Sequence, residues 1–231
     1  MEFTKRIETI GSYVKRDSVV ADVGTDHGYL PIFLVIKGIS KKVYAMDLRK
    51  APLMKAKENI EKTKTEDSIE TILSDGLLAI GNRRIDTVVI AGMGGMLINK
   101  ILLEAEDILK KVDSLVLSPH LDAEQVRKTV HKLGYNIVQE DFIKDEGKHY
   151  PILICNRGIE ISSYSELEYK YGKIIKSEAK EVYCEFLGNK INKIDIIIKN
   201  LCKSNTKTSV FRMQELEKEK NEIKEVMKWL G

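Results

Sequence analysis

Residues able to bind a small molecule are concentrated in the segment VVADVGTDHGYLP, residues 19–31. Asp22 ends a buried apolar run, Gly24 permits a sharp turn, and Gly28 permits close approach to a ligand. A helix beginning near Tyr29 would offer free N–H groups to a carboxylate. Open α/β sheets bind ligands in such loops, at the carboxyl ends of their strands. The segment therefore predicts a binding loop.

The spacing of this loop favours one cofactor over another. The glycines form GxxxG rather than the dinucleotide pattern GxGxxG, and Asp26 and His27 lie between them. An aspartate would repel a pyrophosphate but attract a cofactor with a cationic amine and sulfonium. The loop therefore favours S-adenosylmethionine over NAD. Asp26 and His27 are also candidate catalytic residues.

Acidic residues end the next two apolar runs. Asp47, followed by Leu48, lies at a position where an acid accepts hydrogen bonds from ribose hydroxyls. The alternative is an N-cap for a helix near Lys50. Asp75, followed by Gly76, would meet the adenine N6 amine, and a helix N-cap explains it equally well.

A second glycine-rich loop, AGMGG, spans residues 91–95. Its three glycines would let the backbone lie flat beside a ligand. We assign Ala91 and Gly92 to the cofactor, and Gly92, Met93 and Gly94 to catalysis. Enzymes that methylate exocyclic amines often carry (N/D)PP(Y/F) here, so its absence favours a target with a free lone pair, such as a ring nitrogen. The alternative is a plain turn.

Candidate substrate contacts follow the next apolar run. Ser118, Pro119 and His120 could line the target pocket, or form a turn before a helix. Tyr29 and Tyr150 could stack on a flipped base, although half-buried tyrosines at the ends of elements are commonly structural.

Alternating apolar runs and helical patterns must position these residues. Strands are expected at 18–23, 42–46, 69–73, 86–92, 114–119, 135–143 and 150–158. Helices are expected at 29–37, 50–62, near Leu77, at 95–110 and at 122–133, the last capped by Asp122 and ended by Gly134. This order predicts an α/β fold with a doubly wound parallel sheet. A hairpin near 145–148 should place the final strand antiparallel at the end of the sheet, as in class I methyltransferases.

Beyond Gly158 the pattern becomes helical. Six apolar residues follow a heptad-like spacing: Cys184, Leu187, Ile191, Ile194, Ile198 and Leu201. A turn at 204–207 and a second helix, with Val210, Met213, Leu216, Ile223, Val226, Met227 and Leu230 on its apolar side, complete a helical hairpin. We expect a catalytic domain at 1–158 and the hairpin at 159–231. The hairpin has fourteen basic and twelve acidic residues, so it is not a polybasic arm.

Composition narrows the protein class further. The 231 residues are 43% hydrophobic and 32% charged, without an 18-residue apolar run, so no membrane span is expected. The N-terminus lacks the apolar core of a secretory signal, and it predicts an amphipathic helix with Ile7, Ile10 and Val14 on one face. The three cysteines are far apart in the sequence, which indicates core thiols in a reducing cytoplasm. The four histidines lack the spacing of metal ligands, so no metal is expected.

Taken together, five segments resemble the bacterial tRNA (adenine(22)-N1)-methyltransferases. These are DVGTDHGYLP, AMDLRKAPL, LSDGL, AGMGG and EDFIKDEGKHYPI, and the opening KRIETIGSYV is also similar. The resemblance covers the whole chain and implies a class I fold, S-adenosylmethionine as methyl donor and tRNA as substrate. The family carries a QPN-like segment where this chain has SPH, which puts the details of base contact in question.

The predicted reaction is therefore methylation of N1 of adenine 22 in tRNA by a cytoplasmic enzyme, with a monomer favoured. Two alternatives remain at this stage: a methyltransferase for a small metabolite, and a non-catalytic RNA-binding protein on a relict methyltransferase fold.

Overall fold

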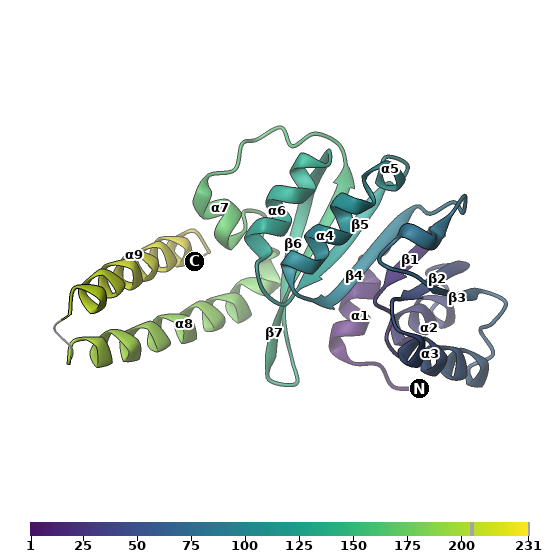
Figure 1. Cartoon of the computed structure of the whole chain (residues 1–231), viewed down its shortest axis with the longest axis horizontal. Helices are drawn as coiled ribbons and strands as arrows, with labels where there is room; N and C mark the ends of the chain where they lie inside the picture. Colours follow the sequence, from purple (N-terminus) through teal and green to yellow (C-terminus); the bar gives the residue numbers. More distant parts are fainter. Residues whose placement is uncertain (204–205, 231) are drawn as a thin grey trace.

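A seven-stranded sheet organises the chain (Figure 1). The computed structural model describes residues 1–203 and 206–230. The strands are β1 (Val19–Val23), β2 (Lys42–Asp47), β3 (Ile69–Leu73), β4 (Thr87–Met93), β5 (Ser114–Pro119), β6 (Tyr135–Asp145) and β7 (Lys148–Arg157). Their order across the sheet is β3-β2-β1-β4-β5-β7-β6. The predicted doubly wound sheet is confirmed.

The hairpin at the end of the sheet differs from the expectation in one respect. β7 is antiparallel to both β5 and β6, as predicted, but it lies between them, so β6 forms the edge. The residues of β7 from Ile152 to Cys155 are buried without alternation, which is typical of an interior strand covered on both faces. The turn through Glu146 and Gly147, both with positive φ, returns the chain into that position.

Helices cover both faces of the sheet. They are α1 (Lys5–Ser12), α2 (Tyr29–Ile36), α3 (Lys50–Lys62), α4 (Gly95–Glu104), α5 (Glu106–Leu109), α6 (Ala123–Lys132), α7 (Glu166–Tyr171), α8 (Lys180–Leu201) and α9 (Lys207–Leu230), with short 3₁₀ turns η1 (Leu78–Ile80) and η2 (Ser177–Ala179). The single helix expected at 95–110 is in fact two, α4 and α5, which are separated at Ala105.

Asp122 is the N-cap residue of α6, as predicted, but its side chain does not cap the helix. Asp122 precedes the helix in a left-handed conformation with φ 57°, and within the described residues its side chain makes no capping hydrogen bond. Its carbonyl oxygen instead accepts from the backbone N–H of Gln125. The α6 C-terminus follows the prediction, because Gly134 has φ +77°.

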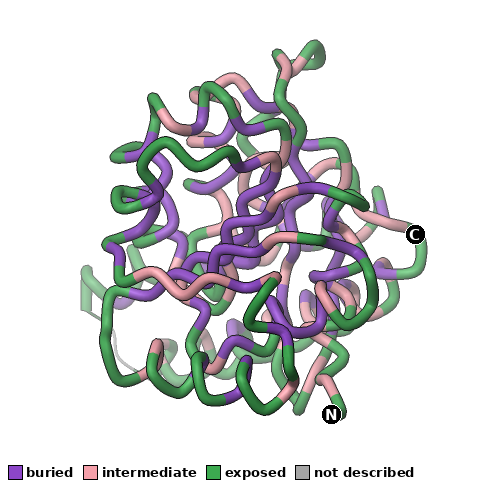
Figure 2. The backbone as a smooth tube through the Cα atoms, turned by 90° about the vertical axis from the view of Figure 1, so that its right-hand side faces the viewer, coloured by how far each residue is buried: buried purple, intermediate pink, exposed green. Residues whose placement is uncertain are grey.

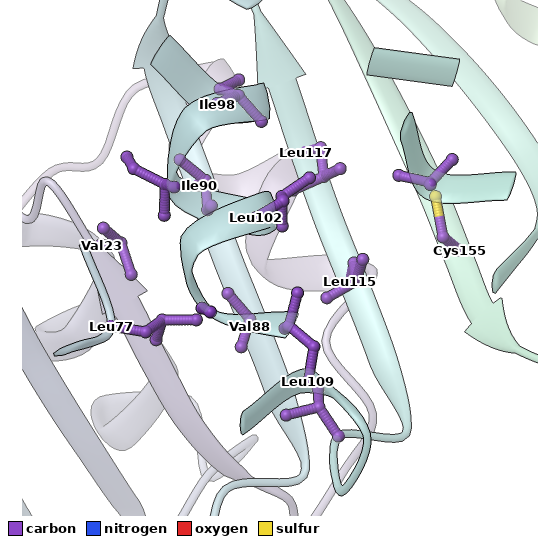
Figure 3. Close-up of a cluster of buried hydrophobic side chains, with 14 of the residues drawn as sticks. Val23, Leu77, Val88, Ile90, Ile98, Leu102, Leu109, Leu115, Leu117 and Cys155 are labelled. Atoms are coloured by element: carbon purple, nitrogen blue, oxygen red, sulfur yellow. The ribbon is translucent and has the colours of Figure 1, made fainter. Parts of the chain in front are cut away.

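Two apolar clusters sandwich the sheet, so its central strands are buried (Figure 2). One cluster packs α4 and α6 onto the sheet, where Ile98 and Leu102 lie against Ile90 and Leu117 (Figure 3). The other packs α1, α2 and α3 onto the opposite face. Alternate residues of β1 enter different clusters: Val20 joins the second, Ala21 and Val23 the first, as the period of a strand requires.

The two long helices form the predicted hairpin, which projects from the body of the molecule (Figure 1). All six heptad positions of α8 contribute to a third apolar cluster. On α9 the expected apolar side is confirmed at Leu216, Ile223, Val226, Met227 and Leu230, which join this cluster. Val210 is 41% exposed, and Met213 is half-buried but outside the cluster. Ser204 and Asn205 of the predicted turn lie outside the described residues. The cysteines are not uniformly core thiols, since Cys155 is buried but Cys202 is exposed.

The base of this hairpin is joined closely to the sheet. Arg127 of α6 donates to Glu140 of β6 at 2.7 Å, and the backbone of Glu140 donates to the carbonyl oxygen of Ile174 at 2.8 Å. Phe142 of β6 lies in the same apolar cluster as α8 and α9. The catalytic sheet and the hairpin therefore share contacts beyond the expected boundary at residue 158, and that boundary stays a prediction.

Candidate functional site

A cavity of about 370 Å³ opens at the carboxyl ends of the central strands. This volume lies within the usual range for small-molecule sites. Its walls come from α1, the loops after β1 to β4, and α4. They comprise Arg6, Val23, Gly24, Asp26, Asp47, Leu48, Arg49, Ser74, Asp75, Gly76, Ala91, Gly92, Met93, Leu97 and Ile101. Residues predicted separately from four loops are thus brought together.

The loop after β1 is held by backbone hydrogen bonds to β2. The N–H groups of Gly24 and Thr25 donate to the carbonyl oxygen of Met46 at 2.8 and 2.9 Å. Gly24 has φ +77°, a backbone conformation that residues with a side chain rarely adopt, and a Cβ there would also displace the flexible end of the Met93 side chain. Asp26 also has positive φ. The turn therefore requires glycine at 24 and directs the exposed Asp26 carboxylate to the cavity rim.

Gly28 has a different role from the one expected. It precedes α2 with φ +74°, and a Cβ would lie 3.1 Å from Cβ of Ala56 in α3. It lines neither cavity of this region. Gly28 is needed for the packing of α2 against α3 rather than for direct approach to a ligand.

Asp47 is 5% exposed and holds two backbone N–H groups. One carboxylate oxygen accepts from Arg49 at 2.9 Å and the other from Asp26 at 3.4 Å. The N-cap of α3 is Arg49, so the alternative role of Asp47 as that cap is wrong. The carboxylate is instead fixed at the cavity wall, and ribose binding by Asp47 stays a prediction.

Asp75 is likewise available to a ligand. The side chain of Ser74, not that of Asp75, accepts the N–H of Ala79 at 3.0 Å at the start of η1. Asp75 is exposed at the cavity wall beside Gly76. A carboxylate that no helix end uses is suited to an amine such as adenine N6, which stays a prediction.

Asp22 is enclosed beneath the loop. Its side chain is buried, and burial together with the nearby Asp47 carboxylate raises the pKa of Asp22 to about 7. The Arg6 guanidinium opposes this shift. A buried acid beside a second acid favours a cationic ligand, because a cation would relieve the repulsion between them.

The glycines of the second loop divide into two kinds. Gly92 has φ +82° and is exposed at the cavity, and a Cβ there would lie 3.1 Å from Nη2 of Arg6. Gly95 is buried, and its Cβ would lie 2.5 Å from the carbonyl oxygen of Leu121. Gly94 has no described atom within 4 Å of its Cβ position and an ordinary φ of −68°. Gly92 therefore lines the cofactor cavity, whereas Gly94 is not among the described lining residues and has only open space at its Cβ position; a ligand role for Gly94 stays a prediction.

Arg6 is the most consequential of the lining residues that were not predicted from the sequence, which also include Val23, Arg49, Ser74, Leu97 and Ile101. Arg6 comes from α1, and its guanidinium lies 4.8 Å from the ring centroid of Tyr150. The backbone N–H of Arg6 donates to Asp145 at 3.2 Å, which ties α1 to the β6–β7 turn. The signal was the cation on the otherwise apolar face of the opening helix. Arg6 and Arg49 are the cations among the described lining residues, and Arg49 lies 3.7 Å from the Asp47 carboxylate, so Arg6 is the one better suited to a carboxylate of a ligand.

A smaller cavity of about 110 Å³ continues beneath α1 and shares Arg6, Gly24, Asp26 and Ala91 with the first. His27 and Tyr29 line it, and their rings stack at 5.6 Å between centroids. Nδ1 of His27 is buried without a hydrogen-bond partner among the described residues. The two cavities form one cleft with acids toward β2 and β3 and a cation at α1.

The candidate substrate residues lie in unequal environments. Ser118 is 1% exposed, and its hydroxyl has no hydrogen-bond partner in the described chain. Pro119 is buried, whereas His120 is exposed and donates its backbone N–H to the carbonyl oxygen of Met93 at 2.8 Å. This contact places residues 118–120 directly beside the second glycine-rich loop, residues 91–95.

The two tyrosines also differ. Tyr29 is 41% exposed. Tyr150 is 9% exposed, with Arg6 over its ring and the His120 ring 5.6 Å away. Tyr150 is therefore not an open stacking surface and is not among the described residues that line the two cavities, whereas Tyr29 lines the smaller cavity and is partly open to solvent.

Two further observations concern other kinds of site. Across residues 1–203 and 206–230, no group of three or more potential ligand side chains could hold a metal ion. Over the same ranges, no helix is both long and apolar enough to cross a membrane.

Comparisons with known proteins give consistent results. A methyltransferase domain model matches residues 3–153. The chain is 30% identical over 175 residues to the Bacillus subtilis tRNA (adenine(22)-N(1))-methyltransferase, covering 76% of this chain and 74% of that protein.

Solved structures extend the similarity to the helical hairpin. A Streptococcus pneumoniae structure in complex with S-adenosyl-L-methionine aligns with a TM-score of 0.87 and 29% identity, covering 98% of this chain and 100% of that one. M. capricolum TrmK in complex with S-adenosyl-homocysteine aligns with a TM-score of 0.85 and 25% identity over the whole of both chains.

Proposed function

Because this chain belongs to the methyltransferase domain family and, within it, to the tRNA (adenine(22)-N1)-methyltransferases, we propose a role for each part of its cleft. The protein is an S-adenosylmethionine-dependent enzyme that methylates N1 of adenine 22 in tRNA. The observation that carries this function is the whole-chain alignment with cofactor-bound relatives, together with a cleft whose charges match that cofactor.

The residues present fit S-adenosylmethionine. Asp22 and Asp47 supply carboxylates near the loop, and Arg6 supplies the cation that a carboxylate of the cofactor requires. Asp47 would hold the ribose hydroxyls, and Asp75 the adenine amine. When bound, S-adenosylmethionine supplies an electrophilic methyl group on a sulfonium.

The chain's own contribution to the reaction is chiefly positioning. Adenine N1 carries an in-plane lone pair, so no base has to remove a proton before attack. Gly92, Met93 and Gly94 would let the adenine lie close to the methyl donor, which is the arrangement that lowers the barrier through proximity.

Asp26 and His27 form a polar pair at the rim of the cleft. The Asp26 carboxylate lies 3.6 Å from Nε2 of His27. The methylated adenine is cationic until a proton leaves N6, so Asp26 would stabilise that charge or hold the cofactor amine, and His27 would accept the proton. Ser118, Pro119 and His120 would contact the adenine from the opposite wall, with Tyr29 available for stacking.

The proposal also covers the domains of the enzyme, its partner and its location. Residues 1–158 form the catalytic domain, and residues 159–231 the helical hairpin domain. The enzyme acts on tRNA in the cytoplasm as a monomer without a bound metal. The small-metabolite and non-catalytic alternatives are set aside because the family acts on tRNA and relatives of the same overall fold bind the cofactor.

The test is transfer of a labelled methyl group to unmodified tRNA, followed by mapping of the product by mass spectrometry. We expect the label on N1 of adenine 22. A tRNA with guanine at that position is the matched control and should remain unlabelled. Label on an exocyclic amine, on a ribose or on another nucleotide would contradict the proposal.

A further inference from the structure

A cavity of about 240 Å³ lies where the sheet meets the base of the helical hairpin. Its walls come from the β5–α6 connection, β6, β7, α7 and α8. The described residues that line it are all different from those lining the cofactor cleft. Two of them, Pro119 and His120, are assigned above to the target adenine, but the lining residues of β6, β7, α7 and α8 have no role in the site proposed above.

Four aromatic rings from three elements gather in this cavity. Phe142 of β6, His149 of β7, and Tyr183 and Phe186 of α8 all line it. The ring centroids of Phe142 and Phe186 are 5.1 Å apart, and those of His149 and Phe186 are 5.3 Å apart. Phe142 and Tyr183 are buried, so His149 and Phe186, which are half-buried, offer the stacking surface for a planar ligand. Stacking on such rings tolerates any nucleobase.

Two of the lining residues carry unsatisfied polar atoms. The hydroxyl of Tyr171 and Nε2 of His149 are buried without a hydrogen-bond partner among the described residues. Buried polar groups are normally paired. A ligand with donors and acceptors along its edge would satisfy them, which an aliphatic ligand would not.

The charges around the cavity disfavour an anion. Its lysines, Lys170 and Lys190, are each paired at 2.7 Å with a glutamate of α9. The carboxylates of Glu140 and Asp141 also line it. A phosphate would meet these acids and would have to displace the lysines from their partners. A neutral planar heterocycle with a polar edge fits better.

The cavity begins next to the site of methyl transfer. His120 lines it, and the backbone N–H of His120 donates at 2.8 Å to the carbonyl oxygen of Met93, which lines the cofactor cleft. A nucleic acid with its target base at Met93 therefore passes the mouth of this second cavity.

We propose that this cavity is a subsite for one unpaired nucleobase of the tRNA other than the target adenine. The inference rests on the proposed function. N1 lies on the Watson–Crick edge, so a paired adenine must be unpaired before attack. Unpairing disturbs the adjacent nucleotides and leaves the opposite base without its pairing partner. The subsite stacks one such base on Phe186 and its neighbours, and thereby holds the opened tRNA in place.

The experiment uses the full-length enzyme and tRNA carrying 2-aminopurine, whose fluorescence falls on stacking. One tRNA carries the probe at a nucleotide flanking adenine 22, and another at the nucleotide that pairs with it. We expect one of the two probes to be quenched on binding wild-type enzyme, which identifies the source of the base. With Phe186→Leu, which keeps apolar volume but removes the ring, the quenching should be lost.

Steady-state kinetics supply the second readout. Phe186→Leu should raise KM for tRNA about tenfold, because stacking on one aromatic ring is lost, while the Kd for S-adenosylmethionine is unchanged and reports an intact fold. Phe211→Leu is the matched control, since Phe211 is 64% exposed on α9, and it should behave as wild type.

The possible failures are distinguishable. Wild-type enzyme that transfers no methyl group to tRNA would overturn the proposed function. If the wild-type enzyme methylates tRNA, and Phe186→Leu shows the same KM for tRNA and the same probe quenching, the subsite alone would be overturned. Absence of quenching at both probe positions would likewise overturn it.

Discussion

At the scale of single residues, the buried acid Asp22 links cofactor binding to pH. Burial and the neighbouring Asp47 raise its pKa to about 7 from an ordinary 3.8. Between these values the folded protein keeps a proton that the unfolded chain has released, so the free energy of unfolding falls as the pH rises through this window. A cationic cofactor prefers the ionised acid, so binding and proton release are coupled.

We therefore expect the affinity for S-adenosylmethionine to fall as the pH is lowered below about 7, by up to about tenfold per pH unit. Asp22→Asn should abolish this slope and stabilise the ligand-free protein above the same pH. Calorimetric titration and thermal unfolding across the range measure both effects, with the exposed Asp67→Asn as control. Equal slopes in wild type and Asp22→Asn would contradict the assignment.

Asp47 is the residue on which ribose recognition should depend. Asp47→Ala removes a charged acceptor and releases the N–H groups of Arg49 and Asp26. Hydrogen bonds to a charged group contribute about 1.5–3 kcal/mol each, so we expect the Kd for S-adenosylmethionine to rise by about 10- to 100-fold. Asp67→Ala is the matched exposed control. An unchanged Kd by calorimetry would rule out the ribose role.

At the scale of elements, the two glycine loops contain one position that the turn needs and one that we propose lies beside the target adenine. Gly24 has a left-handed backbone with φ +77°, whereas Gly94 has an ordinary φ and open space among the described residues. The same substitution at the two positions therefore separates backbone strain from ligand contact.

Gly24→Ala should lower the free energy of unfolding by about 1–3 kcal/mol because of the left-handed backbone, and weaken cofactor binding with it. Gly94→Ala should leave the melting temperature unchanged but reduce kcat, since the added methyl group enters the space assigned to the adenine. Differential scanning calorimetry and single-turnover rates give the two readouts. A fully active Gly94→Ala enzyme would place the adenine elsewhere.

At the scale of the whole molecule, a buried ion pair joins the sheet to the segment leading into the hairpin. Arg127 is 3% exposed and Glu140 is 1% exposed. Arg127 also donates to the carbonyl oxygen of Tyr169 at 2.8 Å, and Glu140 accepts from the backbone of Lys173. The pair thus fixes α7, and with it the start of α8, against the edge of the sheet.

Arg127→Met should therefore lower the free energy of unfolding by about 3–5 kcal/mol, because the Glu140 charge is left buried without its partner. Arg127→Met combined with Glu140→Gln should recover much of that loss, since an amide needs no counter-charge. Chemical denaturation of the single and double variants measures the coupling. Equal destabilisation in both would show that the bonds to α7, rather than the charges, carry the stability.

The sequence by itself determined the order of elements, the parallel sheet and the grouping of acids and glycines at one edge, because periodicity and glycine placement are local properties. Most of the predicted cofactor residues line one cleft for that reason. Only the tertiary structure decided three other matters: β7 lies between β5 and β6, Gly28 packs against α3, and Arg6 reaches the cleft from α1. Each depends on contacts between residues far apart in the chain. The cavity beneath the hairpin arises in the same way, because Phe142, His149 and Phe186 meet only after β6, β7 and α8 have packed together.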